Sequence, residues 1–153
     1  MELNFLKVIP RRTPDGMLVS RESVISAVFR RTWRKVDYPG ARLEYQEYVV
    51  NIRWPIMLQI QLHVSRYGVG GELQEHIDTI RDGERQFRIQ FILRNAIRGG
   101  ELLCERFIVN WRRFKIFEPA RYRHQVTRIE EGQRILLNLG IRYALRPIRP
   151  CPF

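Results

Sequence analysis

The segment 56-IMLQIQLHV-64 carries the clearest structural pattern in this chain. Ile, Leu and Val stand at every second position, and Met, Gln, Gln and His fill the positions between them. This period of two predicts a half-buried β-strand. Residues 87–93 and 135–143 alternate in the same way and predict two more strands of one sheet.

The segments around this pattern extend the sheet. Residues 2–9 and 43–54 are rich in β-forming residues and predict strands, and residues 103–117 form a longer strand-like run. The polar segment 118–134 is interpreted as a loop or a frayed helix. The Pro-rich segment 146–153 predicts an extended C-terminal tail.

Two helices are expected beside the sheet. Ser20 can cap a helix over residues 21–36, in which the apolar residues fall on one face. A short helix is predicted over residues 72–81. Because no β-α-β rhythm is present, we expect an α+β fold. It is a single globular domain over residues 1–153, an antiparallel sheet of about six strands with one long amphipathic helix and one short helix packed on it.

The charge of the chain is large, Arg-rich and unevenly distributed. The 153 residues hold 27 basic and 16 acidic side chains, and all but three of the basic ones are Arg. Residues 1–35 carry a net charge of +5, residues 36–84 carry −4 and residues 85–153 carry +10. Arg forms two-bonded contacts with phosphate, so this polarity predicts an anionic partner such as RNA or an anionic membrane surface.

The basic residues divide between the predicted long helix and the later segments, where aromatic residues accompany them. Arg beside aromatic side chains suits stacked single-stranded RNA, and clustered Arg suits an anionic lipid leaflet equally well. The candidate residues for binding nucleic acid or an anionic surface are Arg30, Arg31, Arg34, Lys35, Arg112, Arg113, Lys115, Arg121, Arg123 and Arg128.

The acidic middle segment predicts self-association. Its carboxylates fall at helical spacing on the outer face of the predicted short helix, which is also the usual pattern of a solvated surface. A negative patch can dock on the positive segment of a second copy, head to tail. The candidate residues of this acidic patch are Glu72, Glu75, Asp78 and Asp82.

The histidines and cysteines are interpreted as structural. His63 is predicted on a strand, His76 on the short helix and His124 in a loop, and Cys104 forms no C-x-x-C pair with Cys151. On this interpretation we expect no metal site, no cofactor, no catalytic residue and no small-molecule substrate. A pairing of Cys104 with His63 or His124 as nucleophile and base stays open, since such partners meet only in the fold.

The location of the chain is predicted from what its sequence lacks. No apolar run reaches about 18 residues, so no transmembrane segment is expected. The first residues show no secretory signal pattern. Two cysteines in a chain of this length form no disulfide framework, which favours a reducing compartment such as the cytoplasm or nucleus of a host cell.

The order of elements in the first third resembles a known family. A strand ends at Leu6-Lys7-Val8, a Pro14-Asp15-Gly16 turn follows, an amphipathic helix extends from Ser20 to Val36, and Tyr38-Pro39-Gly40 leads into strands. Over about 40 residues this order resembles the globular domain of matrix proteins of rhabdoviruses and related negative-strand RNA viruses. The chain departs from that family in lacking a Lys-rich N-terminal tail and a PPxY-type motif.

The resemblance implies a non-enzymatic viral structural protein of matrix type, present in the virion. Such a protein would self-associate and bridge nucleocapsid RNA or nucleoprotein and an anionic membrane surface. The alternative is a basic RNA-binding module, such as a viral silencing suppressor or movement protein.

Overall fold

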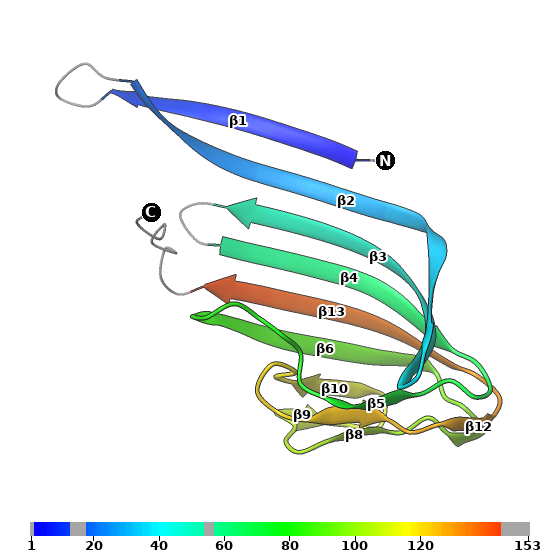
Figure 1. Cartoon of the computed structure of the whole chain (residues 1–153). Coiled ribbons are helices and arrows are strands. Elements are labelled where there is room, and N and C mark those ends of the chain that lie inside the picture. Colours follow the sequence, from blue (N-terminus) through cyan, green and yellow to red (C-terminus); the bar gives the residue numbers. More distant parts are fainter. Residues whose placement is uncertain (1, 13–17, 54–56, 145–153) are drawn as a thin grey trace.

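The computed structural model describes residues 2–12, 18–53 and 57–144, and within them the chain is all-β (Figure 1). These residues form no helix. The strands, in chain order, are β1 (Glu2–Arg12), β2 (Leu18–Tyr38), β3 (Ala41–Arg53), β4 (Met57–Tyr67), β5 (Leu73–His76), β6 (Glu84–Arg94), β7 (Arg98–Gly99), β8 (Leu102–Cys104), β9 (Val109–Asn110), β10 (Phe114–Phe117), β11 (His124–Val126), β12 (Ile129–Glu131) and β13 (Arg134–Ala144).

One antiparallel sheet curls into a half-barrel. Its long strands lie in the order β1-β2-β3-β4-β13-β6, and β10 and β9 continue beyond β6. At one end β5 pairs with the start of β3, and β11 and β8 follow β5. Figure 1 shows these short strands folded beneath the long ones. β7 and β12 form a separate two-stranded sheet.

The three strands at the middle of the sheet confirm the predictions made from alternation. β13 pairs with β4 on one side and with β6 on the other, over most of their lengths. The polar side chains that alternate with the apolar ones, however, face the concave side, where those of β4 are half-buried and those at the centre of β6 and β13 are buried. Gln90 and Asn138 are 5% and 3% exposed, whereas Leu62 on the convex side is 40% exposed. The half-barrel therefore encloses a polar interior, which is unusual for a packed core and typical of a binding site.

The apolar core lies at the curled end of the sheet. It consists of buried side chains from the long strands and from the short strands beneath them: Tyr67, Ile92, Leu102, Phe117, Val126, Ile129 and Leu136. Phe117 and Ile129 are fully buried. This cluster holds β5, β8, β10 and β11 against β4, β6 and β13.

The predicted α+β class is wrong. Residues 21–36 lie in β2, which pairs with β1 along one edge and with β3 along the other, so that Val28 lies opposite Val49. Val and Ile are stiff at χ1 and favour strands, and the hydrogen bonds of two neighbouring strands override an amphipathic helical pattern. The short helix predicted over residues 72–81 is instead β5 and the loop that follows it.

The boundaries of several other elements also differ from those predicted. The strand predicted over residues 103–117 is divided into β8, β9 and β10, and the segment 118–134, predicted without strands, holds β11 and β12. The predicted strand at residues 2–9 is confirmed and extends to Arg12. The predicted tail at residues 146–153 lies outside the described residues. In the described part of the chain no helix could cross a membrane.

Candidate metal centre

Two histidines and one aspartate meet where β5 and β11 pair. His76 ends β5, Asp78 follows in the loop, and His124 begins β11. The antiparallel register places His124 directly opposite His76, and the two ring centroids lie 4.3 Å apart. A single rung of the ladder therefore joins residues that are far apart in the sequence.

The ligand-type atoms of these three side chains converge. All three lie within 4.8 Å of one another. The Nε2 atoms of His76 and His124 lie 3.3 Å and 3.7 Å from the same oxygen, Oδ1 of Asp78. Two imidazole nitrogens and one carboxylate oxygen around a shared point form a possible coordination set for a divalent cation.

Hydrogen bonds at the other ring nitrogens orient the two histidines. Nδ1 of His76 lies 2.8 Å from the carbonyl of Gln74, and Nδ1 of His124 lies 3.3 Å from the carbonyl of Tyr122. A carbonyl only accepts, so each Nδ1 carries a proton, and Nε2 is the nitrogen of each ring that a metal ion would bind after displacing any proton from it. Nε2 of His124 is buried and has no hydrogen-bond partner among the described residues. This orphaned nitrogen, the tautomers and the donor types all fit a bound metal ion.

The second oxygen of Asp78 is held by neighbours on β6. Nη2 of Arg88 donates to Oδ2 of Asp78 at 2.6 Å, and Nε2 of Gln86 donates to the same oxygen at 3.2 Å. The two carboxylate oxygens of Asp78 therefore have different partners: Oδ2 accepts hydrogen bonds from β6, and Oδ1 faces the histidines. Such outer contacts orient a ligand and favour binding through one oxygen.

The protonation states also suit a cation. Burial opposes ionisation of Asp78, but the hydrogen bond from His76 and the charge of Arg88 outweigh it, so the pKa of Asp78 lies well below its usual value. Burial lowers the pKa of His124 to about 4. The hydrogen bond to Asp78 raises the pKa of His76. At neutral pH, Asp78 is anionic and His124 is neutral, and a metal would displace any proton held by His76.

A cavity of about 290 Å³ lies beside this cluster on the concave face of the sheet. Its walls include His124 from the cluster, Arg88 from β6, His63 and Tyr67 from β4, and Asn138 from β13. Burial lowers the pKa of His63 to about 4 and raises the pKa of Tyr67. A neutral imidazole and a protonated phenol therefore face the cavity at neutral pH. Its volume is at the lower end of the range for small-molecule sites.

A buried hydrogen-bond network supports the floor of this cavity. Nε2 of Gln90 donates to Asn138 at 2.9 Å, and Nδ2 of Asn138 donates to Ser65 at 3.2 Å. Arg134, 2% exposed, donates to Gln90 and to the carbonyl of Gly100. These bonds fix polar side chains across β4, β13 and β6 and keep the interior rigid.

The predicted basic site is distributed over several elements. Arg30, Arg34 and Lys35 lie on β2, where Arg34 pairs with Glu47 at 3.3 Å. The remaining pairs of predicted basic residues are Arg30–Glu47, Lys35–Glu44, Arg121–Glu118 and Arg123–Glu75. Arg112, Arg113 and Arg128 are exposed, Lys115 on β10 bonds Asn110, and the side chain of Arg31 lies outside the described residues. Binding of an anionic partner by this set stays a prediction.

The predicted acidic patch does not share one helical face. Glu75 lies on β5 and pairs with Arg123 at 3.2 Å, and Asp82 is exposed in the following loop. Glu72 directly precedes β5. Asp78 points inward to the histidines, and its Oδ1 lies 3.3 Å from Nε2 of His76. Self-association through this segment stays a prediction.

Cys104 does not act with a histidine in the described structure. It lies opposite His124 in the β8–β11 ladder, but its thiol donates to the carbonyl of Arg106 at 3.2 Å. Burial raises the pKa of Cys104. A protonated, hydrogen-bonded thiol is a poor nucleophile.

The cluster was not predicted from the sequence, because the three histidines are far apart along the chain and fall on different predicted elements. The signal was the spacing His76-x-Asp78, followed later by His124. In an extended segment, residues i and i+2 point to the same side, so this spacing can place an imidazole and a carboxylate together. The helical assignment of residues 72–81 hid that relation and made Asp78 one of several surface carboxylates.

The comparisons with known proteins are sparse. No protein-family profile and no curated protein matches the chain. Among solved structures it is similar to the viral collagen prolyl hydroxylase vCPH from Paramecium Bursaria Chlorella virus-1, solved as a 2OG complex, with 20% sequence identity and a TM-score of 0.45. The match covers 56% of this chain and 59% of that chain. A likeness at this level establishes neither fold nor function, so the site rests on its own geometry.

Proposed function

We propose that this protein is a metal-dependent enzyme of the non-haem iron(II) oxygenase type. The observation that carries the proposal is the convergence of His76, Asp78 and His124, whose ligand atoms all lie within 4.8 Å of one another. Two histidines and one carboxylate with open positions are the ligand set of this enzyme class. An iron ion bound there would supply the activation of molecular oxygen.

The surroundings of the cluster support an enzymatic site over a structural one. A structural zinc site is closed by four protein ligands, whereas this cluster offers three and adjoins a cavity of about 290 Å³. Arg88 and Gln86 hold the aspartate, and two backbone carbonyls hold the histidines. The chain itself therefore positions the ligands and leaves one side open to a small molecule.

The cavity is suited to a small molecule that bears a carboxylate. Arg88 lines it, and Nε of Arg88 is buried without a hydrogen-bond partner among the described residues. Tyr67 lines it as well and keeps its phenolic proton, because burial raises its pKa. A cation and a neutral donor on the wall of a confined cavity favour an anionic oxygen ligand.

Anaerobic metal titration of the purified chain tests the proposal. We expect one Fe(II) per chain by calorimetry, and a Co(II) complex whose visible spectrum changes when a small dicarboxylate such as 2-oxoglutarate is added. Asp78→Asn should weaken metal binding at least about 10-fold, the lower bound for loss of a contact in a ligand shell. Asp82→Asn removes an exposed carboxylate in the same loop and is the matched control.

Two results would contradict the proposal. One is the absence of stoichiometric metal binding in the folded wild-type chain. The other is equal affinity of the Asp78→Asn and wild-type proteins. Zn(II) binds most nitrogen and oxygen sites more tightly than Fe(II), so its affinity decides nothing. Binding of Fe(II) without any response of the iron-loaded protein to oxygen would keep the metal site and reject the oxygenase assignment.

This proposal departs from the expectation of a non-enzymatic protein. The matrix-type role and the alternative of an RNA-binding module stay predictions that rest on charge and on a pattern of elements. No contact among the described residues gives further support to the matrix-type role or to the RNA-binding module.

A further inference from the structure

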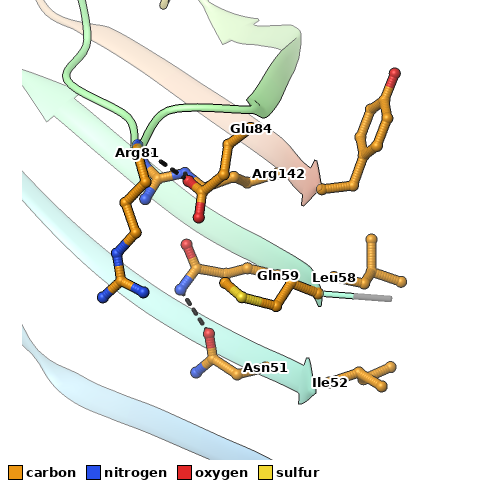
Figure 2. Close-up of a pocket in the computed structure, with 9 residues that line it drawn as sticks. Asn51, Ile52, Leu58, Gln59, Arg81, Glu84 and Arg142 are labelled. Atoms are coloured by element: carbon orange, nitrogen blue, oxygen red, sulfur yellow. Dashed lines mark hydrogen bonds and ion pairs between the residues drawn. The ribbon is translucent and has the colours of Figure 1, made fainter. Parts of the chain in front are cut away.

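A second, smaller cavity lies beside Gln59 on β4 and Arg142 on β13 (Figure 2). It has a volume of about 100 Å³. Gln59 lines it, while Gln61 and His63, two and four residues further along β4, line the larger cavity. Residues two apart on a strand face the same side, so the two cavities follow one another along the concave surface. The other polar side chains around the smaller cavity are Asn51, Arg81, Glu84 and Arg142.

Two buried polar atoms in this cavity have no hydrogen-bond partner among the described residues. They are Oε1 of Gln59, which is an acceptor, and Nε of Arg142, a donor that lies 3.8 Å from Oε2 of Glu84 in an ion pair but beyond hydrogen-bond distance. One other atom of each side chain, a nitrogen, forms a hydrogen bond. Nε2 of Gln59 donates to Asn51, and Nη2 of Arg142 donates to Gln86 at 3.4 Å. Buried polar atoms are nearly always paired, so one unpaired acceptor and one unpaired donor in one cavity indicate a missing polar ligand.

One side chain joins this cavity to the metal centre. Gln86 accepts from Arg142 through Oε1 and donates from Nε2 to Oδ2 of Asp78 at 3.2 Å. Gln86 is 3% exposed, so both bonds are shielded from water. A group bound at Arg142 would therefore be connected to the carboxylate of Asp78 through the side chain of Gln86 alone.

We propose that this cavity binds an amide group of the substrate. Its N–H would donate to Oε1 of Gln59, and its C=O would accept from Nε of Arg142. A carboxylate offers only acceptors and would face the charge of Glu84, and an ammonium offers only donors and would face Arg142. An amide carries a donor beside an acceptor and no charge, which matches the two open atoms. That the amide belongs to a substrate rests on the proposed oxygenase function, whereas the binding of an amide in this cavity does not.

Nuclear magnetic resonance on the metal-free, ¹⁵N-labelled chain tests this site directly. N-methylacetamide is the probe, and the side-chain N–H signals of Gln59 and Arg142 are followed during titration in the presence of a chelator. We expect saturable shifts of both signals with a dissociation constant in the millimolar range. Acetate and methylammonium, which match the probe in size, should cause no saturable shift.

Two variants separate the site from general solvent effects. Gln59→Leu removes the open acceptor and should weaken binding of the probe at least about 10-fold. Gln61→Leu changes the neighbouring glutamine on the same strand and should leave the affinity unchanged. If Gln59→Leu perturbs the fold, the wild-type protein supplies the test instead. The signal of Arg142 should then shift with the neutral amide and not with acetate, and the absence of this difference would contradict the amide site.

The source of the amide is resolved by two further probes. N-acetylglycinamide presents an open-chain amide and uracil presents a ring imide, and tighter binding of one assigns the class of substrate. Absence of saturable shifts with every amide would mean that water fills the cavity, and it would overturn the proposal. Equal binding of acetate would do the same. Because these titrations contain no metal, loss of amide binding and loss of iron binding are separate outcomes.

Discussion

Lowering the pH from 7 to 5 should destabilise the metal-free protein through His63. This side chain lines the polar cavity, and burial, followed by the charge of Arg88, lowers its pKa from 6.5 to about 4. Between these two values the unfolded chain binds more protons than the folded chain, so the free energy of unfolding falls as the pH falls. The shift corresponds to a loss of about 2 kcal/mol over this range. Solvent that reaches the cavity reduces the loss to about 1 kcal/mol.

The measurement compares wild type with His63→Gln, which cannot titrate. Urea unfolding is followed by tryptophan fluorescence at pH 7, 6 and 5 in the presence of a chelator. His76, whose pKa is raised, has the opposite dependence on pH, but it is present in both proteins and its contribution cancels. Wild type should lose about 1–2 kcal/mol more than the variant between pH 7 and 5. Parallel curves for the two proteins would refute the reasoning that His63 is held neutral in the folded chain.

Three further substitutions probe the fold around the site. Phe117→Ala empties a fully buried position and should lower the free energy of unfolding by about 3–5 kcal/mol in urea; a loss under 1 kcal/mol would show that the core is not packed as described. Gly99→Ala should open the β7–β12 pair to amide hydrogen exchange, because its φ is 75° and the new Cβ would overlap the carbonyl oxygen of Arg128. Gly83→Ala has a φ of 80° but open space around it, so equal exchange in both variants would contradict the steric argument. Arg134→Gln replaces a buried guanidinium by a shorter side chain that does not reach the carbonyl of Gly100. It should lower the free energy of unfolding by about 2–3 kcal/mol. An unchanged midpoint of thermal unfolding would exclude an anchoring role for Arg134.

Alternation predicted the middle of the sheet correctly because it reports a local property. In residues 57–64 and 135–143 the period of two survives in β4 and β13. It does not report which face is covered. Leu62 is 40% exposed and Asn138 is 3% exposed, so burial follows the curl of the sheet and not hydropathy. Sequence pattern alone carries no information about the direction in which a sheet curls.

The helix predicted over residues 21–36 shows the opposite problem. Its apolar spacing fits a helix, and its Val and Ile residues also fit a strand. Pairing with β1 and β3 decides between the two, and these partners come from other parts of the chain. The candidate metal centre could have been predicted in part. His76-x-Asp78 is a local signal, but its union with His124 depends on the β5–β11 register, which no local pattern contains.

The β4–β13 ladder has a consequence for how the protein is made. It joins residues 57–67 to residues 134–144, so the concave face cannot close until the second of these segments has left the ribosome. His76 and Asp78 are synthesised before that point, when this part of the sheet is still incomplete. Pairing between strands so far apart in the sequence is slow. During that interval the nascent chain exposes the edge of β4 that later pairs with β13. This edge therefore stays available to strands of other chains until residues 134–144 have been made.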